Sequence, residues 1–186
     1  MGQIKVTYNA GGIEGLCIIE PKVHGDSRGY FTETYNKRDM SEAGLNFDFV
    51  QDNQSSSVKG VLRGLHFQIN YPQTKLVRVI KGSVFDVAVD LRKDSKTFGK
   101  YFSIELSAEN HKQFLIPKNF AHGFLVLSDE AEFCYKCDDF YHPNDEGGII
   151  FSDPDINIKW PDVGVPFIFS EKDKKLKTLS SVTLHP

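Results

Sequence analysis

KLVRVIKGSVFDVAVDLR at residues 75–92 contains two runs rich in Val, Ile and Phe, separated by Gly82 and Ser83. Short apolar or alternating runs bounded by turn-forming residues are typical of β-strands. Runs of the same kind recur along the chain: LCIIE at 16–20, YFTETY at 30–35, YFSIEL at 101–106, QFLIP at 113–117, GFLVL at 123–127 and EFCYK at 132–136. The sequence therefore predicts an all-β protein.

Helices play a minor part in this prediction. Only KRDMSEAGL at 37–45 and SEKDKKLKTL at 170–179 favour short peripheral helices, the second with Ser170 able to cap its first turn. No repeat, low-complexity tract or linker divides the chain, so we expect one domain over residues 1–186. Among antiparallel folds of this size, a jelly-roll barrel or sandwich fits the number of strands and encloses a pocket between them.

Composition excludes several classes of function. The net charge of −3 comes without a sustained basic stripe, which argues against binding to nucleic acid or to an anionic membrane. No apolar run approaches the ~20 residues of a membrane span, and the N-terminus does not resemble a signal peptide, so we expect a cytoplasmic protein. The three cysteines, Cys17, Cys134 and Cys137, are predicted to be reduced strand residues.

The segment QDNQSSSVKGVLRGLHFQ at 51–68 concentrates polar groups and ends with Arg63 and His66. Taken alone, a histidine in a strand is more often a structural residue than a catalyst. Strict alternation would place Arg63 and His66 on opposite faces of the strand. Either Gly64 marks a bulge that re-aims one of them, or Arg63 serves a different part of the site.

Other polar residues have both a structural and a functional interpretation. Arg28 and Arg63 are candidate clamps for a diphosphate, although each alone fits a surface ion pair. Lys75 opens an apolar run and can either stay at the mouth of the barrel or point inward towards an oxyanion. Taken singly, Tyr135 fits a packing role and Asp173 an exposed position at the start of a helix.

The histidines do not predict a metal centre. A cupin-type metal site requires an HxH motif with a following Glu, but here Phe67 and Gln68 follow His66. His122, in AHGF, lacks nearby ligand partners in the sequence. Asp86 and Asp90 share one face of a predicted strand, and we interpret that face as solvated. We therefore expect no metal.

Seven segments in order along the chain resemble the dTDP-4-dehydrorhamnose 3,5-epimerase family. These segments are HGDSRGYFTE at 24–33, VQDNQSSSVKGVLRGLHFQ at 50–68, KLVRVIKGSVFDVAVDLR at 75–92, IPKNFAHGFLVLSD at 116–129, EFCYKCDDFY at 132–141, INIKWP at 156–161 and FSEKD at 169–173. The resemblance implies a cupin-like jelly roll, a homodimer that exchanges N-terminal strands, and no cofactor. INYPQT at 69–74 lies outside the similar segments and is expected beside the site.

The resemblance also implies roles for individual residues. It makes His66 the general base, Asp173 its paired carboxylate, Tyr135 the opposing acid and Lys75 the group facing the enolate. Tyr141 would stack on the thymine. The remaining contacts to the sugar nucleotide would be Arg28, Glu33, Gln51, Asp52, Asn53, Arg63, His122, Glu146 and Lys172.

These groups suit inversion of a carbon next to a ketone, since deprotonation there leaves charge that spreads onto the ketone oxygen. Imidazole, with a reference pKa of about 6.5, accepts such a proton, and tyrosine, with a reference pKa near 10, stays protonated to return one. The resemblance implies epimerisation at carbons 3 and 5 of dTDP-4-keto-6-deoxy-D-glucose, giving dTDP-4-keto-L-rhamnose. The alternatives are an epimerase acting at one carbon only, a metal-dependent cupin enzyme, and a non-enzymatic sugar-nucleotide-binding cupin.

Overall fold

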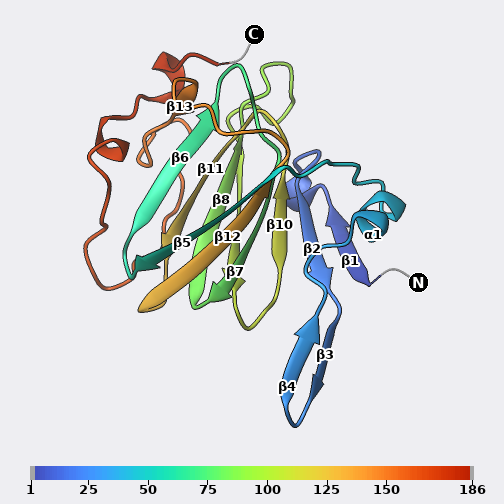
Figure 1. The fold of residues 1–186 in the computed structure, drawn as a ribbon. Helices are drawn as coiled ribbons and strands as arrows, with labels where there is room; N and C mark the ends of the chain where they lie inside the picture. Colours follow the sequence, from blue (N-terminus) through green and yellow to red (C-terminus); the bar gives the residue numbers. More distant parts are fainter. Residues whose placement is uncertain (1–2, 185–186) are drawn as a thin grey trace.

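Two antiparallel sheets and a projecting hairpin make up the computed structural model, which describes residues 3–184 (Figure 1). The six-stranded sheet has the order β1-β2-β10-β7-β12-β5, the five-stranded sheet has the order β13-β6-β11-β8-β9, and β3 pairs with β4. The strands are β1 (Ile4–Tyr8), β2 (Cys17–Pro21), β3 (Val23–Asp26), β4 (Gly29–Thr32), β5 (Gln51–Val58), β6 (Leu62–Gln68), β7 (Lys75–Lys81), β8 (Ser83–Asp90), β9 (Tyr101–Ser107), β10 (Gln113–Ile116), β11 (Phe120–Val126), β12 (Glu130–Cys137) and β13 (Glu146–Gly148).

From β5 to β8 the chain changes sheet at every strand, the connectivity of a jelly roll. The main core lies between the sheets. Phe133 of β12 stacks on Phe124 of β11 with ring centroids 4.2 Å apart, and Val77 and Phe114 bury their side chains in the same cluster. The prediction of an all-β, cupin-like jelly roll is confirmed.

The outer face of the five-stranded sheet is also covered. Val87 and Val89 of β8 pack there, together with Ile149, Ile156 and Ile158 from the segment that follows β13. Figure 1 shows this C-terminal segment running beside β6. Because both faces of β8 are buried, its sequence reads as a nearly continuous apolar run rather than a strict alternation.

The helix predicted at 37–45 is present as α1 (Lys37–Glu42). The Asn36 side chain caps it by accepting hydrogen bonds from the amides of Arg38 and Asp39. Short 3₁₀ helices lie at Ala10–Gly12, Asp173–Lys175 and Leu179–Ser181. Among residues 3–184, no helix is long and apolar enough to cross a membrane.

The helix predicted at 170–179 is wrong. Ser170 does cap a first turn, since its hydroxyl accepts a hydrogen bond from the Asp173 amide at 3.0 Å. The backbone then extends at Leu176, and the carbonyl of Lys177 accepts a hydrogen bond from the Ile150 amide at 2.8 Å. Pairing with a distant segment therefore overrides the helical tendency of the sequence.

The strand predicted at 30–35 is shorter than expected, because β4 ends at Thr32. With β3 it forms a two-stranded hairpin that extends away from the sheets (Figure 1). Tyr30 and Phe31 are 63% and 71% exposed there. The two aromatic side chains are therefore largely exposed, although the Tyr30 ring contacts His111 with ring centroids 4.7 Å apart.

Candidate active site

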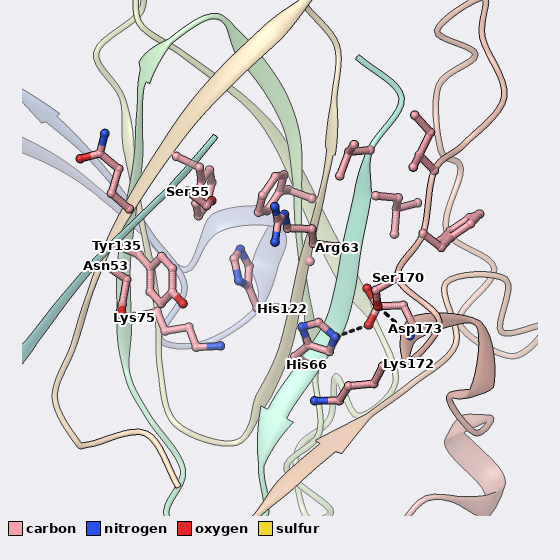
Figure 2. A pocket seen from close by; sticks show the side chains of 18 residues that line it. Asn53, Ser55, Arg63, His66, Lys75, His122, Tyr135, Ser170, Lys172 and Asp173 are labelled. Carbon is pink, nitrogen blue, oxygen red and sulfur yellow. Dashed lines mark hydrogen bonds and ion pairs between the residues drawn. The ribbon is translucent and has the colours of Figure 1, made fainter. Parts of the chain in front are cut away.

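A cavity of about 500 Å³ opens between the two sheets. The five-stranded sheet contributes His66 from β6 and His122 from β11, and the six-stranded sheet contributes Lys75 from β7 and Tyr135 from β12. Asp173 joins them from the C-terminal segment. Figure 2 shows Tyr135 and Lys75 on the side of the cavity across from His66.

His66 and Asp173 form a hydrogen-bonded pair. Nε2 of His66 lies 2.6 Å from Oδ1 of Asp173, whose side chain is 5% exposed. Burial opposes ionisation of Asp173, but the hydrogen bond and charge of His66, with smaller contributions from the Gly64 amide and Ser170, outweigh it and lower the pKa of the carboxyl. An ionised Asp173 accepts the proton on Nε2 and leaves the lone pair of His66 on Nδ1.

A bulge at Gly64 brings Arg63 to the same cavity. Arg63 pairs with Phe124 and His66 with His122, so two residues of β6 face the single residue Gly123 of β11. Gly64 has a φ of 118°, and a Cβ there would lie 2.7 Å from the Gly123 Cα. Positions 64 and 123 therefore both require glycine. Of the two alternatives that the sequence left open, the bulge at Gly64 is the correct one.

His122 forms a second histidine–carboxylate pair with Asp86 of β8. Nε2 of His122 lies 3.0 Å from each carboxylate oxygen of Asp86, which is fully buried. Asp90, on the same face of β8, is also fully buried and accepts hydrogen bonds from Arg92, Ser95 and Thr97. The interpretation of this face as solvated is therefore wrong, because it points into the space between the sheets.

Lys75 and Tyr135 come from neighbouring strands and point inward (Figure 2). Desolvation lowers the pKa of Lys75, an effect partly opposed by Cys137, Asp86 and Glu146. Desolvation also raises the pKa of Tyr135 and so keeps its hydroxyl protonated. The Lys75 amine and the Tyr135 phenol thus face the wall that carries His66.

A second cavity of about 380 Å³ adjoins the first and shares Asn53, His66, Lys75 and Tyr135 with it. Its other lining residues are Gln51, Phe67, Gln68, Gln73, Tyr141 and Glu146. Glu146 also pairs with Lys172, which lines the first cavity. The two hollows together make an elongated site with the histidine–carboxylate pair at their junction.

The chain is similar in sequence and fold to known proteins. The sequence profile of the dTDP-4-dehydrorhamnose 3,5-epimerase family matches residues 11–181. The chain belongs to this family. It is 56% identical over 168 residues to the dTDP-4-dehydrorhamnose 3,5-epimerase of Methanothermobacter thermautotrophicus, covering 90% of this chain and 91% of the relative.

Further relatives of the epimerase family support the same assignment. The dTDP-4-dehydrorhamnose 3,5-epimerase of Shigella flexneri is 57% identical over 163 residues, covering 87% of this chain and 89% of that one. Among solved structures, the dTDP-6-deoxy-D-glucose-3,5-epimerase of Legionella pneumophila in complex with dTDP-4-keto-L-rhamnose superposes with a TM-score of 0.92. It is 49% identical, and the match covers 97% of this chain and 95% of that one.

The epimerase resemblance placed Arg28, Glu33 and Asp52 at the substrate, but all three lie outside the two central cavities of this chain. Arg28 sits on the exposed hairpin and pairs with Asp26 at 2.6 Å. Glu33 follows the same hairpin and accepts a hydrogen bond from Asn36 at 2.9 Å. Neither Arg28 nor Glu33 lines either of the two central cavities.

Asp52 also lies outside both cavities, because of its position in β5. β5 alternates, so Gln51 and Asn53 face inward and Asp52 faces outward, where it pairs with Lys136 at 2.6 Å. A side chain that points away from both cavities does not contact a substrate held in them. The other predicted substrate contacts, Gln51, Asn53, Arg63, His122, Tyr141, Glu146 and Lys172, all line one or both cavities.

Several site residues of this epimerase-family chain were missed in the sequence. Asp86 was assigned to solvent, Ser57 accepts a hydrogen bond from Arg63 at 3.1 Å, and Phe169 lines the main cavity. Of these residues, only Asp86 lay at an alternating position of a predicted strand, and solvated strands show the same pattern. Within residues 3–184, no three His, Cys, Asp or Glu side chains are grouped so that they could hold a metal ion.

Proposed function

We propose that this chain inverts carbons 3 and 5 of dTDP-4-keto-6-deoxy-D-glucose to give dTDP-4-keto-L-rhamnose, a step of dTDP-L-rhamnose biosynthesis. One observation carries the proposal: a base paired with a carboxylate and a protonated phenol lie on opposite walls of one cavity. Epimerisation requires removal of a proton from one face of a carbon and return of a proton to the other face.

In the proposed reaction, the unprotonated Nδ1 of His66 takes the proton from the carbon next to the ketone. The electron pair of the broken C–H bond moves onto the ketone oxygen, where the Lys75 ammonium stabilises the charge that develops. Tyr135 then donates its proton to the opposite face of the carbon as the ketone re-forms. Asp173 keeps His66 in the required tautomer and stabilises the imidazolium.

The second cavity is proposed to take the nucleotide. Gln51, Asn53 and Glu146 offer hydrogen-bonding groups there, and the half-exposed Tyr141 ring offers a flat surface for a base. Arg63 and Lys172 line the main cavity and supply positive charge for the diphosphate. The sugar would then lie between His66 and Tyr135.

We also propose a homodimer in which the β3–β4 hairpin reaches the partner subunit. Tyr30, Phe31 and Val23 are exposed apolar side chains on this hairpin, and covering them would remove that surface from water. Arg28 and Glu33, carried at the same place, would then complete the partner's substrate site. The free cysteines fit the cytoplasm as the compartment for this enzyme.

Incubation with the 4-keto substrate in heavy water tests the function. Proton NMR of the sugar should show loss of the signals at carbons 3 and 5, and His66→Ala should abolish both losses with its circular dichroism spectrum unchanged. Loss at one carbon would indicate a single-carbon epimerase, and dTDP-sugar binding without exchange would indicate a binding protein. Exchange that chelators abolish and iron or zinc restores would indicate a metal-dependent enzyme.

A further inference from the structure

Gln68 is a buried polar residue that the proposed proton transfer does not use. It ends β6, two residues after His66, and is 7% exposed. It lines the second cavity, which is proposed to hold the nucleotide. A buried primary amide is costly to the fold unless its donors and acceptor are all paired.

The Gln68 amide is fully paired with backbone groups. Its Nε2 donates to the carbonyl oxygens of Tyr71 at 2.7 Å and Phe140 at 3.2 Å, and its Oε1 accepts from the His142 amide at 2.6 Å. These two acceptors and one donor fix the orientation of the amide, because a flipped amide would set oxygen against carbonyl oxygen. One side chain therefore joins the end of β6 to two loops.

The partners of Gln68 in the second loop are the two neighbours of Tyr141. Phe140 is held through its carbonyl and His142 through its amide, while the Tyr141 amide itself donates to Oε1 of Gln51 at 2.9 Å. The backbone on both sides of Tyr141 is thus pinned to β5 and β6. The ring itself is 50% exposed, so these backbone contacts help to set its position.

A second set of contacts makes the two loops one unit. Asp145, itself 6% exposed, accepts hydrogen bonds from the amides of Asn70 at 2.9 Å and Tyr71 at 2.9 Å. The Tyr71 ring stacks on His142 with centroids 4.0 Å apart. The segment 69–74, which lies between two of the segments that resemble the family, therefore supports the loop that carries Tyr141.

We propose that Gln68 is a positioning residue that holds Tyr141 as the aromatic wall of the nucleotide cavity. It thereby sets the affinity for the nucleoside end of the sugar nucleotide, while proton transfer at His66 proceeds without it. This inference rests on the proposed function for the identity of the ligand. The structural part of the proposal is that Gln68 affects nucleotide binding through the position of Tyr141.

A double-mutant cycle on dTDP binding tests this coupling. Calorimetry would compare the wild type with Gln68→Met, Tyr141→Ala and the double variant. Loss of the backbone anchors in Gln68→Met should weaken dTDP binding about tenfold, and loss of the ring should weaken it by about tenfold or more. The dissociation constant of the double variant should lie within about threefold of that of Tyr141→Ala. Gln68→Met then removes the anchor of a loop that no longer carries the Tyr141 ring.

Kinetics separate positioning from a general loss of structure. In the heavy-water assay, Gln68→Met should raise KM with kcat within about twofold of the wild type, the pattern of lost ground-state binding. Affinity for inorganic pyrophosphate should not change. Ser95→Ala, which removes hydrogen bonds to the Asp90 loop away from both cavities, is the matched control and should leave dTDP binding unchanged.

Gln68→Glu provides a second variant if Gln68→Met does not fold. The introduced carboxylate would face the carbonyls of Tyr71 and Phe140, whereas its protonated form can donate to one of them. Affinity for dTDP relative to the wild type should therefore recover as the pH falls. A pH-independent ratio would count against the positioning role.

Several outcomes overturn the inference. Unchanged dTDP affinity in Gln68→Met, additive effects in the double variant, or a fall in kcat at constant KM would each show that Gln68 does not act through Tyr141. Failure of the proposed function looks different. In that case the wild type would show no exchange in heavy water, while the dTDP binding cycle would still report on Gln68 and Tyr141.

Discussion

Asp173 is the residue on which the proposed base, His66, depends most directly. Its carboxylate lies 2.6 Å from Nε2 of His66, and its pKa is lowered, so it is an acceptor throughout the neutral range. An amide in its place can present a donor to His66 and favour the wrong tautomer. The proton-accepting nitrogen would then no longer face the substrate.

Asp173→Asn is therefore expected to lower the rate of deuterium exchange at both carbons by about a hundredfold or more. Heavy-water exchange followed by proton NMR measures this. Asp153→Asn is the matched control, because Asp153 is a buried carboxylate of the same C-terminal region that binds the amides of Ile156 and Leu179 outside the cavities. Equal losses of exchange in both variants would contradict a specific role for Asp173.

Tyr135 is expected to matter more for inversion than for exchange. Tyr135→Phe keeps the ring packed but removes the proton that is returned to the far face, so exchange by His66 persists while the inverted product falls about a hundredfold. Comparing deuterium wash-in with product stereochemistry measures the difference. The control is Tyr101→Phe, whose hydroxyl accepts from the Lys159 amide away from both cavities. A parallel loss of exchange and inversion in Tyr135→Phe would remove the acid role.

At the scale of elements, β5 and β6 show how far a strand pattern can be interpreted. β5 reads QDNQSSSV and is a strand over its whole length despite having little apolar character. Its sequence is polar because its inward side lines the cavity rather than the core. In β6, the bulge at Gly64 breaks the alternation and directs Arg63 and His66 to one cavity. Both departures from the usual strand pattern fall at the site.

Asp90, at the end of β8, holds the loop that follows this strand through hydrogen bonds. Burial opposes a charge on Asp90, but hydrogen bonds from Arg92 and two loop hydroxyls outweigh it and lower the pKa of Asp90 to about 2. Because folding lowers this pKa, the charged carboxylate stabilises the fold above its unfolded value of 3.8. That contribution, about 2 kcal/mol, is lost as the pH falls towards the folded value.

Asp90→Asn should therefore lower the free energy of unfolding by about 2 kcal/mol at neutral pH. The gap between variant and wild type should narrow as the pH falls from about 4 to about 2. Urea unfolding at neutral and acidic pH measures both free energies. Asp94→Asn, at an exposed position of the same loop, should behave as the wild type. A gap that does not depend on pH would show that the charge on Asp90 contributes nothing.

At the scale of the whole molecule, the two sheets supply the two halves of the chemistry. The five-stranded sheet provides His66 and His122, and the six-stranded sheet provides Lys75 and Tyr135. Stacking the sheets places the proposed base and the proposed acid on opposite sides of one space. The hairpin projects from this body and carries Arg28 away from its own cavity.

If Arg28 acts in the partner subunit, two inactive variants should complement each other. His66→Ala keeps a working hairpin, and Arg28→Ala keeps a working base. An equimolar mixture allowed to exchange subunits should recover about a quarter of the wild-type activity, because half of the dimers are mixed and each has one intact site. Mixing His66→Ala with Tyr135→Phe is the control and should recover no inversion. A monomeric wild type in ultracentrifugation, or no recovery in the first mixture, would contradict the exchange.

The sequence by itself determined the all-β class, the strands with strong apolar runs and membership of the epimerase family. These rest on local alternation of side chains and on motifs in a fixed order, both of which are properties of the chain itself. The sequence also indicated His66, Tyr135, Lys75 and Asp173, but only through the resemblance, since each has an ordinary structural interpretation alone.

Only the tertiary structure decided which faces point inward and which distant residues meet. It brought Asp173 to His66 across 107 positions, buried Asp86 beside His122, turned Asp52 outward and replaced the helix predicted at 170–179. Each outcome depends on how the sheets stack and where the C-terminal segment pairs. Local periodicity specifies a strand and its alternation but does not specify what covers either face.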